Sequence, residues 1–212
     1  MKYAFEVVKR ASFRTLPSAV AIAYRIMRRK VMGPRLLVFG LASSDLEKVE
    51  AIEMPGYRVE HFLTWSDVSP YLREELSCKS RDLEWDVQKK FELGGTLWIG
   101  RLHGQLANAG WSRVGSKVRS WFFPLAPTWF VIMDCVTLPE FRWSGLYHTM
   151  LSSMAQTLFG QGADLLLTCS NDWNLPSIHG IEKAGFKKVG YGIKRKGRLR
   201  WYQIVNPDLT NI

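Results

Sequence analysis

Residues 129–147 place a tight turn between a strand and a helix, and a turn of this kind can bind a phosphate group. The apolar run at 129–133 predicts the strand, and Pro139 marks the turn. Apolar residues then recur at helical spacing, at positions 146, 147, 150, 151, 154, 155 and 158. Gly160 and Gly162 end this segment. The turn at 142–147 therefore presents backbone N–H groups at the positive end of a helix, which favours a phosphate ligand.

A second strand and a second helix follow directly. Residues 164–169 form a short apolar run typical of a strand. Residues 174–186 then predict a short helix that ends at Gly185. The whole unit is a strand, a turn, a helix, a strand and a helix.

These two segments, in this order, resemble the GNAT superfamily of N-acetyltransferases. The turn is similar to the family's pyrophosphate loop, [RQ]-x-x-G-x-[GA], with Arg142 and Gly145 in place and Tyr147 at the position of the final small residue. The second helix is similar to N-x-x-[AS]-I-x-x-[YF]-E-K-x-G-F, but Ile181 stands where the family has an aromatic residue. The matching residues of the second motif are Asn174, Ser177, Ile178, Glu182, Lys183, Gly185 and Phe186.

The resemblance implies an α/β fold with a mixed, mostly antiparallel central sheet and helices on both faces. We expect this acyltransferase domain to span residues 35–212, after a basic N-terminal helical extension at 1–34. The remaining patterns predict strands at 35–41, 96–102, 105–113, 186–194 and 199–205, helices at 67–76 and 82–93, and a turn at Pro55-Gly56 within the polar segment 42–62. Residues 114–128 are interpreted either as an edge strand over a satellite core or as an apolar wall beside the substrate.

The resemblance also implies an acyl-CoA co-substrate, most simply acetyl-CoA. The family's strand end pairs its backbone with pantetheine and stabilises the oxyanion, and its turn amides bind the pyrophosphate. The expected cofactor-binding residues are therefore Val136, Thr137, Leu138, Arg142, Trp143, Ser144, Gly145, Leu146, Tyr147 and Asn174. Tyr147 either crowds the loop or turns its ring into the core. Acceptor recognition is expected at residues 71–84.

The reaction involves two proton transfers, one from the attacking amine and one to the leaving thiolate, and each needs a candidate residue. Asp134, on the central strand, is the candidate base that deprotonates the amine, and an ion-paired or solvated strand carboxylate is the equal alternative. His103 and His179 are weaker candidates. Many family members use a tyrosine at the position of Ile181 to protonate the leaving thiolate. Ser177, one helical turn earlier, or a water molecule is the candidate replacement.

The net charge of +10 is concentrated at the two ends of the chain. Residues 1–35 carry +8 and residues 182–200 carry +7, whereas residues 36–181 carry −4. The basic start surrounds a short apolar stretch at 16–24, which is too short to span a bilayer. It is interpreted as an amphipathic helix packed on the domain, a peripheral membrane anchor or a transit peptide. Nucleic acid is a less favoured partner, since no recognised nucleic-acid-binding motif accompanies the positive charge.

The composition, 47% hydrophobic and 23% charged, is that of a soluble globular protein. Three scattered cysteines, two of them on predicted strands, indicate buried thiols in a reducing compartment, and no metal site is expected. The resemblance implies an N-acyltransferase that acts on a small-molecule amine, and the cysteines favour a cytoplasmic location, with peripheral contact at the inner membrane face left open. The alternatives are an enzyme that takes a longer acyl chain from acyl carrier protein, and a non-catalytic GNAT-like module that binds a membrane or polyanion.

Overall fold

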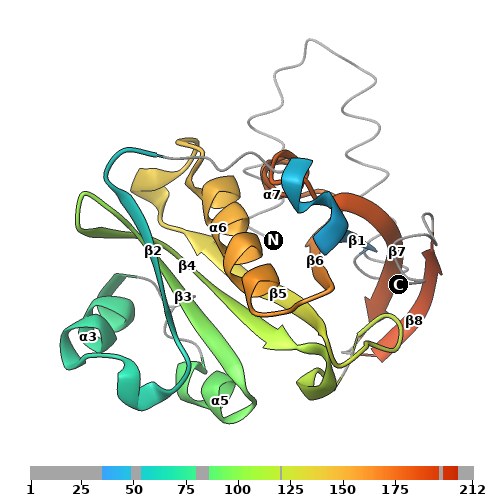
Figure 1. Cartoon of the computed structure of the whole chain (residues 1–212), viewed down its shortest axis with the longest axis horizontal. Helices are drawn as coiled ribbons and strands as arrows, with labels where there is room; N and C mark the ends of the chain where they lie inside the picture. The colour runs from blue at the N-terminus through green and yellow to red at the C-terminus, as the bar shows by residue number, and fades with distance from the viewer. Residues whose placement is uncertain (1–34, 49–53, 80–85, 120, 196–197, 205–212) are drawn as a thin grey trace.

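The computed structural model describes residues 35–48, 54–79, 86–119, 121–195 and 198–204 (Figure 1). The expected basic extension at 1–34 and the turn of the last hairpin at 196–197 lie outside the described residues. Within those residues, no helix is long and apolar enough to cross a membrane. The division into an extension and a domain at 35–212 stays a prediction.

The described strands form one eight-stranded sheet in the order β2-β3-β4-β5-β6-β1-β7-β8. β5 and β6 are parallel neighbours, and the other neighbouring pairs are antiparallel, which confirms the expected mixed sheet. The strands are β1 Arg35–Ala42, β2 Tyr57–Phe62, β3 Gly95–Leu102, β4 Gln105–Val114, β5 Trp129–Thr137, β6 Leu165–Asn171, β7 Lys187–Arg195 and β8 Arg198–Ile204.

Helices cover both faces of the sheet, because successive strand residues point to opposite faces. In β3, Trp98 belongs to the core under α6 and α7, whereas Leu97 and Ile99 belong to the core under α3 and α5 (Figure 1). The α-helices are α3 Pro70–Lys79, α5 Val87–Glu92, α6 Leu146–Gly160 and α7 Leu175–Lys183. Four 3-10 turns lie in the described part of the chain, η1 Ser43–Lys48, η2 Trp65–Asp67, η3 Gly115–Lys117 and η4 Pro139–Phe141.

Three expectations about local structure need correction. The polar segment 42–62 contains an edge strand, β2, whose alternating polar side chains hide it from a search for apolar runs. Asp67 closes a capping box with Thr64 on the η2 turn, so α3 begins later, at Pro70. The second predicted helix is described only as the six residues of α5, since residues 80–85 are outside the described part.

Between the end of β4 at Val114 and the start of β5 at Trp129, the described residues contain no edge strand, which corrects that expectation. The aromatic residues of this segment pack instead on the far part of the sheet. Phe122 is 2% exposed and joins Trp129, Leu165 and Leu167 in a third buried cluster. The satellite core predicted for this segment is therefore present.

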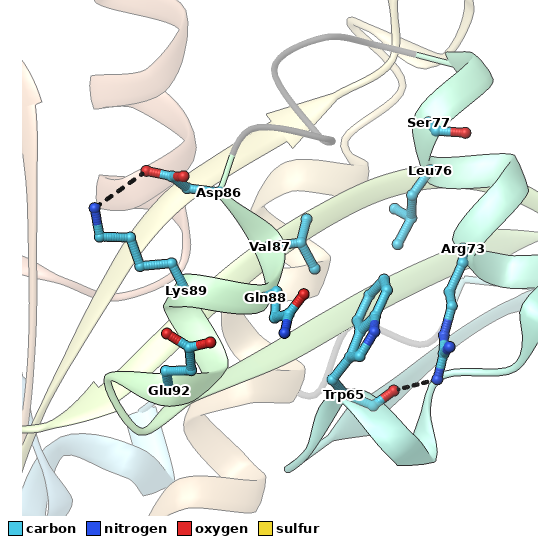
Figure 2. A pocket seen from close by; sticks show the side chains of 9 residues that line it. All are labelled: Trp65, Arg73, Leu76, Ser77, Asp86, Val87, Gln88, Lys89 and Glu92. Carbon is cyan, nitrogen blue, oxygen red and sulfur yellow. Dashed lines mark hydrogen bonds and ion pairs between the residues drawn. The ribbon is translucent and has the colours of Figure 1, made fainter.

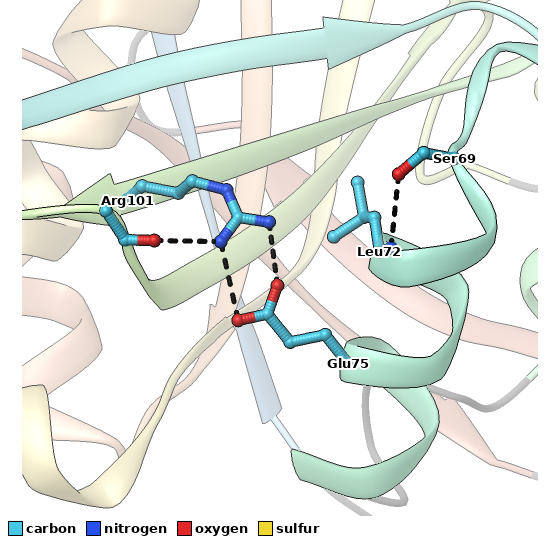
Figure 3. Close-up of polar contacts among 5 residues, drawn as sticks. Ser69, Leu72, Glu75 and Arg101 are labelled. Carbon is cyan, nitrogen blue, oxygen red and sulfur yellow. Dashed lines mark hydrogen bonds and ion pairs between the residues drawn. The ribbon is translucent and has the colours of Figure 1, made fainter.

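Helix α3 is fixed to the sheet by a forked ion pair (Figure 3). The Arg101 guanidinium on β3 donates to both Glu75 carboxylate oxygens, over 2.7 and 3.4 Å. Both side chains are mostly buried, at 18% and 12% exposure. Two parallel charge-assisted hydrogen bonds hold an orientation as well as a distance. They place α3 beside the β3–β4 hairpin.

Candidate functional site

A cavity of about 180 Å³ opens where β5 and β6 separate. The two strands pair only from Trp129 with Leu165 to Val131 with Leu167, although β5 continues to Thr137. The cavity brings together four of the residues expected from the sequence, Asp134, Tyr147, Asn174 and Ser177. Its other lining residues are Leu36, Met133, Cys135, Thr168, Cys169, Ser170 and Asn171.

The separation follows from a β-bulge in β5. The register between β4 and β5 shifts between Ala109 and Trp111, so that Asp134 and Cys135 both lie opposite Gly110. Asp134 adopts a φ of 51°, which is uncommon for a residue with a side chain. A bulge bends its strand and increases the local twist. It thus turns the end of β5 away from β6, and no local pattern in the sequence indicated it.

The bulge also determines the surroundings of Asp134. Its carboxylate is 49% exposed and lies 2.8 Å from the ammonium of Lys90 on α5, which is only 12% exposed. Asp134 is therefore ion-paired, which is the alternative expected for it, and it also lines the cavity, while its role as the base stays a prediction. A substrate amine that approached Asp134 would have to share the carboxylate with Lys90.

At the end of β5, some backbone N–H groups face β4 and others face the gap beside β6. The Leu138 N–H donates to the Ala107 carbonyl over 2.9 Å, so it is committed to β4 and is not a donor for an oxyanion. Because successive residues of a strand direct their backbone groups to opposite edges, Thr137 faces the gap beside β6. The Thr137 carbonyl accepts a hydrogen bond from Arg142 Nε over 3.2 Å. Among the three strand-end residues expected to bind pantetheine, Thr137 is the one whose backbone faces the gap.

The turn that follows is shaped as a cradle for an anion. Trp143 and Gly145 have positive φ angles of 70° and 86°, and Gly145 is the N-cap of the 15-residue helix α6. A Cβ atom at Gly145 would lie 2.9 Å from the imidazole of His148. The positive φ favours glycine, and any other residue would require the His148 side chain to move. The first N–H groups of a helix have no partner within the helix, so those of α6 are available to a ligand. The turn at 142–147 therefore has the form of an anion-binding turn, and its binding of pyrophosphate stays a prediction.

A buried asparagine ties this turn to the sheet, and the sequence analysis missed it. Asn108 on β4 is 1% exposed, accepts a hydrogen bond from the Tyr57 hydroxyl over 2.8 Å and donates to the Leu146 carbonyl over 3.1 Å. Burial raises the pKa of Tyr57 well above its usual value, so the phenol remains a donor. The sequence feature that could have indicated this role is a polar residue, Asn108, within an otherwise apolar strand.

Replacement of Asn108 by alanine should destabilise the protein. The variant leaves the Tyr57 hydroxyl and the Leu146 carbonyl without their buried partner, and each such loss costs about 1–3 kcal/mol. We expect the midpoint of urea unfolding to fall accordingly. A serine variant at exposed Ser116 on η3, Ser116→Ala, serves as a control and should unfold like the wild type. An unchanged midpoint for Asn108→Ala would contradict the anchoring role.

Tyr147 packs its ring against the main core, which is the second of its two expected placements. Its ring lies against Gly180 of α7, where a Cβ atom would clash with it, and the Ser177 hydroxyl hydrogen-bonds the phenol. Burial raises the pKa of Tyr147 above its usual value, so its phenol stays protonated. Ile181 is 0% exposed and packs in the core below. The hydroxyl groups of this part of the cavity are therefore those of Tyr147 and Ser177.

The cysteines on the two strands line the cavity, and Cys135 also packs against the main core. Neither Cys135 nor Cys169 forms a disulfide bond. Burial raises the pKa of the Cys135 thiol to about 12, so it is uncharged near neutral pH. No group of metal-ligating side chains occurs among the described residues. His103 and His179, the weaker candidates for the base, are exposed and are not among the residues that line the cavity.

His148 should make the stability of the protein depend on pH. Burial, and then the charge of Lys183, lower the pKa of His148 below its usual 6.5. Below that pH the unfolded chain binds more protons than the folded protein, so stability must fall as the pH drops. We expect denaturation between about pH 7.5 and about pH 5.5 to show a smaller loss of stability for His148→Gln than for the wild type. Identical pH dependence in the two proteins would contradict this.

A second, larger pocket of about 640 Å³ lies between η2, α3 and α5 (Figure 2). Its wall includes Arg73, whose guanidinium lies 4.3 Å from the centre of the Trp65 ring and donates to the Trp65 carbonyl over 2.7 Å. Arg73, Leu76 and Ser77 come from the segment expected to recognise the acceptor. The end of that segment, at 80–84, lies outside the described residues. The other lining residues are Asp86, Val87, Gln88, Lys89 and Glu92.

Comparisons with known proteins place the fold. No family model matches the chain, and no curated protein matches it. Solved structures of GNAT acetyltransferases do: one from Colwellia psychrerythraea, at 14% identity and a TM-score of 0.52, covers 74% of this chain. Another from Sphaerobacter thermophilus, at 14% identity and a TM-score of 0.52, covers 81%. The chain spans little more than half of each of these two proteins, 53% and 54%.

The third similar structure is the aminoglycoside acetyltransferase AAC(6')-Ib in complex with coenzyme A. It is 20% identical, has a TM-score of 0.53 and is matched over 73% of this chain and 98% of its own length. At these identities the similarity establishes the fold alone.

Proposed function

From the premise that this chain has the GNAT acetyltransferase fold, we propose that it is an acyl-CoA-dependent N-acyltransferase that transfers an acetyl group to a primary amine. The observation that carries the proposal is the cavity between the separated ends of β5 and β6, next to the turn at the start of α6. A strand gap and an anion cradle side by side fit a thioester that ends in a pyrophosphate. Either feature alone would be far less specific.

The turn supplies the binding energy for the nucleotide end of the donor. Backbone amides at 142–147 and the α6 dipole would hold the pyrophosphate. The pantetheine arm would then extend along the free edge of β5, where the Thr137 backbone faces the gap. Asn174, at the start of α7, lines the same gap and can hydrogen-bond the arm.

The thioester would lie in the cavity beside the bulge. A ternary complex gains most of its rate from holding amine and thioester together, because the reaction becomes effectively unimolecular. A backbone N–H aimed at the carbonyl oxygen would stabilise the tetrahedral intermediate. Asp134, half-exposed at the edge of the cavity, is the candidate that accepts the amine proton, directly or through water.

The size of the cavity favours a short acyl group. About 180 Å³ accommodates a thioester and an acetyl group, whereas a long acyl chain needs a deeper apolar pocket. Acetyl-CoA is therefore the preferred donor over a long-chain acyl carrier protein. The acceptor is proposed as a small amine, with the pocket beside α3 and α5 available for the rest of that molecule.

Titration calorimetry with coenzyme A, followed by thiol release from acetyl-CoA in the presence of a panel of small primary amines, tests the proposal. We expect saturable binding of one coenzyme A per chain and amine-dependent thiol release. Absence of coenzyme A binding would overturn the proposal. Binding without thiol release for any amine would favour the non-catalytic module.

A further inference from the structure

We propose that the chain forms a symmetric dimer in which the edge strand β2 pairs antiparallel with the β2 of a second copy. This inference is independent of the proposed function. Among the described strands, β2 is at one end of the sheet and is paired on one side only, with β3. Such an edge presents a row of backbone N–H and C=O groups with which a further strand can pair. The charges of β2 favour a second copy as that strand.

The hydrogen bonds to β3 show which backbone groups of β2 face the free edge. The His103 N–H donates to the Gly56 carbonyl over 2.8 Å, and this pair directly precedes β2 in the register that β2 keeps with β3. Hydrogen-bonded pairs alternate along an antiparallel ladder, and this one has no register shift. The backbone groups of Tyr57, Val59 and His61 therefore face away from β3.

A two-fold axis at Val59 lets two copies of this edge pair with each other. The Val59 residues then form two hydrogen bonds, and each His61 N–H donates to the opposite Tyr57 carbonyl. The Tyr57 N–H takes no part in the pairing, because it donates to the Met54 carbonyl in the turn before β2, over 3.0 Å. This register uses every other group that faces the edge except the His61 carbonyl.

The same register places opposite charges against each other. Arg58 and Glu60 flank Val59, are both exposed and lie on one face of β2. With the axis at Val59, Arg58 of each copy lies directly opposite Glu60 of the other. This is a non-hydrogen-bonded pair, in which opposed side chains are closest. A shift of the pairing by two residues would instead oppose Arg58 to Arg58 or Glu60 to Glu60, so the charges select one register.

Neither charge has an opposite partner in the described part of its own chain. Arg58 lies opposite Arg101 of β3, which is already bound to Glu75 of α3. Glu60 lies opposite Ile99, whose side chain is apolar. The second copy therefore supplies a counter-charge for both residues.

The pairing also covers apolar surface beyond β2. Leu63 follows the strand and is 63% exposed. The same register brings it opposite Pro55 of the second copy, which is exposed before β2 begins. A short strand pair buries less than the roughly 1,600 Å² of a standard interface, so we expect a dissociation constant in the micromolar range.

Sedimentation equilibrium of the full chain tests the proposal directly. The ionic strength should be about 0.15 M, so that the net charge of +10 is screened beyond about 8 Å. We expect the wild type to change from monomer to dimer as its concentration rises through the micromolar range.

Exchange of the two charges tests the register. Arg58→Glu opposes carboxylates and Glu60→Arg opposes guanidinium groups, so each should raise the Kd of the dimer about tenfold or more. The double variant restores both pairs with the charges exchanged and should dimerise like the wild type. Lys188→Glu changes the net charge as Arg58→Glu does, but at an exposed position on β7, and should leave the Kd unchanged.

Val59→Pro tests the backbone pairing. The N–H of Val59 faces the free edge, so proline removes a donor there without removing a hydrogen bond to β3. The variant should give the circular dichroism spectrum of the wild type and remain monomeric at concentrations at which the wild type is a dimer.

A wild type that stays monomeric at every concentration would overturn the proposal, and so would a dimer that Arg58→Glu does not weaken. A double variant that dimerises no better than the single variants would overturn the register. A folded Val59→Pro protein that still dimerises would show that the interface lies elsewhere. None of these results depends on coenzyme A, so failure of the dimer and failure of the proposed function are distinguished.

Discussion

Gly145→Glu should abolish coenzyme A binding in a folded protein. The new carboxylate would lie at the N-terminus of α6, in the space that the pyrophosphate must occupy. It would also neutralise the positive potential of the helix dipole that attracts the phosphates. Repulsion between the carboxylate and the phosphates adds to the steric exclusion. Titration calorimetry should detect no heat of binding at coenzyme A concentrations that saturate the wild type.

The variant also strains the backbone, and that effect needs its own control. Gly145 has a φ of 86°, and Gly162, just beyond the other end of α6, has a φ of 89° with no atom near its missing Cβ. A non-glycine residue at either position costs about 1–3 kcal/mol of strain. Gly162→Glu therefore carries the same charge and similar strain but should bind coenzyme A normally. Unchanged affinity in Gly145→Glu would refute the assignment of the turn.

Asp134→Asn should lower turnover about 100-fold while coenzyme A affinity stays nearly constant. The amide keeps the shape of the side chain but cannot take a proton from the amine. Asparagine also tolerates a positive φ better than other residues with a side chain, so the bulge should persist. Steady-state kinetics across pH, with an amine found active in the panel, measure the effect.

Lys90→Met distinguishes the base from the ion pair. Both variants remove the ion pair between Lys90 and Asp134, whose charged groups lie 2.8 Å apart, but only Asp134→Asn removes the carboxylate. If the pair serves only to hold α5 on the bulge, the two variants should lose equal activity. We expect Lys90→Met to retain most of it and to keep the acidic limb of the pH–rate profile, which Asp134→Asn should lose.

The sequence by itself determined the order of elements around the site. An apolar run, a proline, a helical repeat and a second apolar run predict β5, the turn, α6 and then β6 in this order, and they place the starts of β5, α6 and β6 within one residue. Gly185 likewise predicted the end of α7. These signals are local, because strand and helix periods and the conformations of proline and glycine depend on a few adjacent residues.

Only the tertiary structure decided how that site is completed. Asp134 meets Lys90, Leu146 meets Asn108, and the Tyr147 ring meets Gly180, each across tens of residues of chain. The bulge in β5 depends on its register with β4, and the edge strand β2 on its pairing with β3. No local period encodes such contacts, since they arise when separate elements pack on one sheet. The residues that could do chemistry were therefore visible in the sequence, whereas their partners were set by the packing.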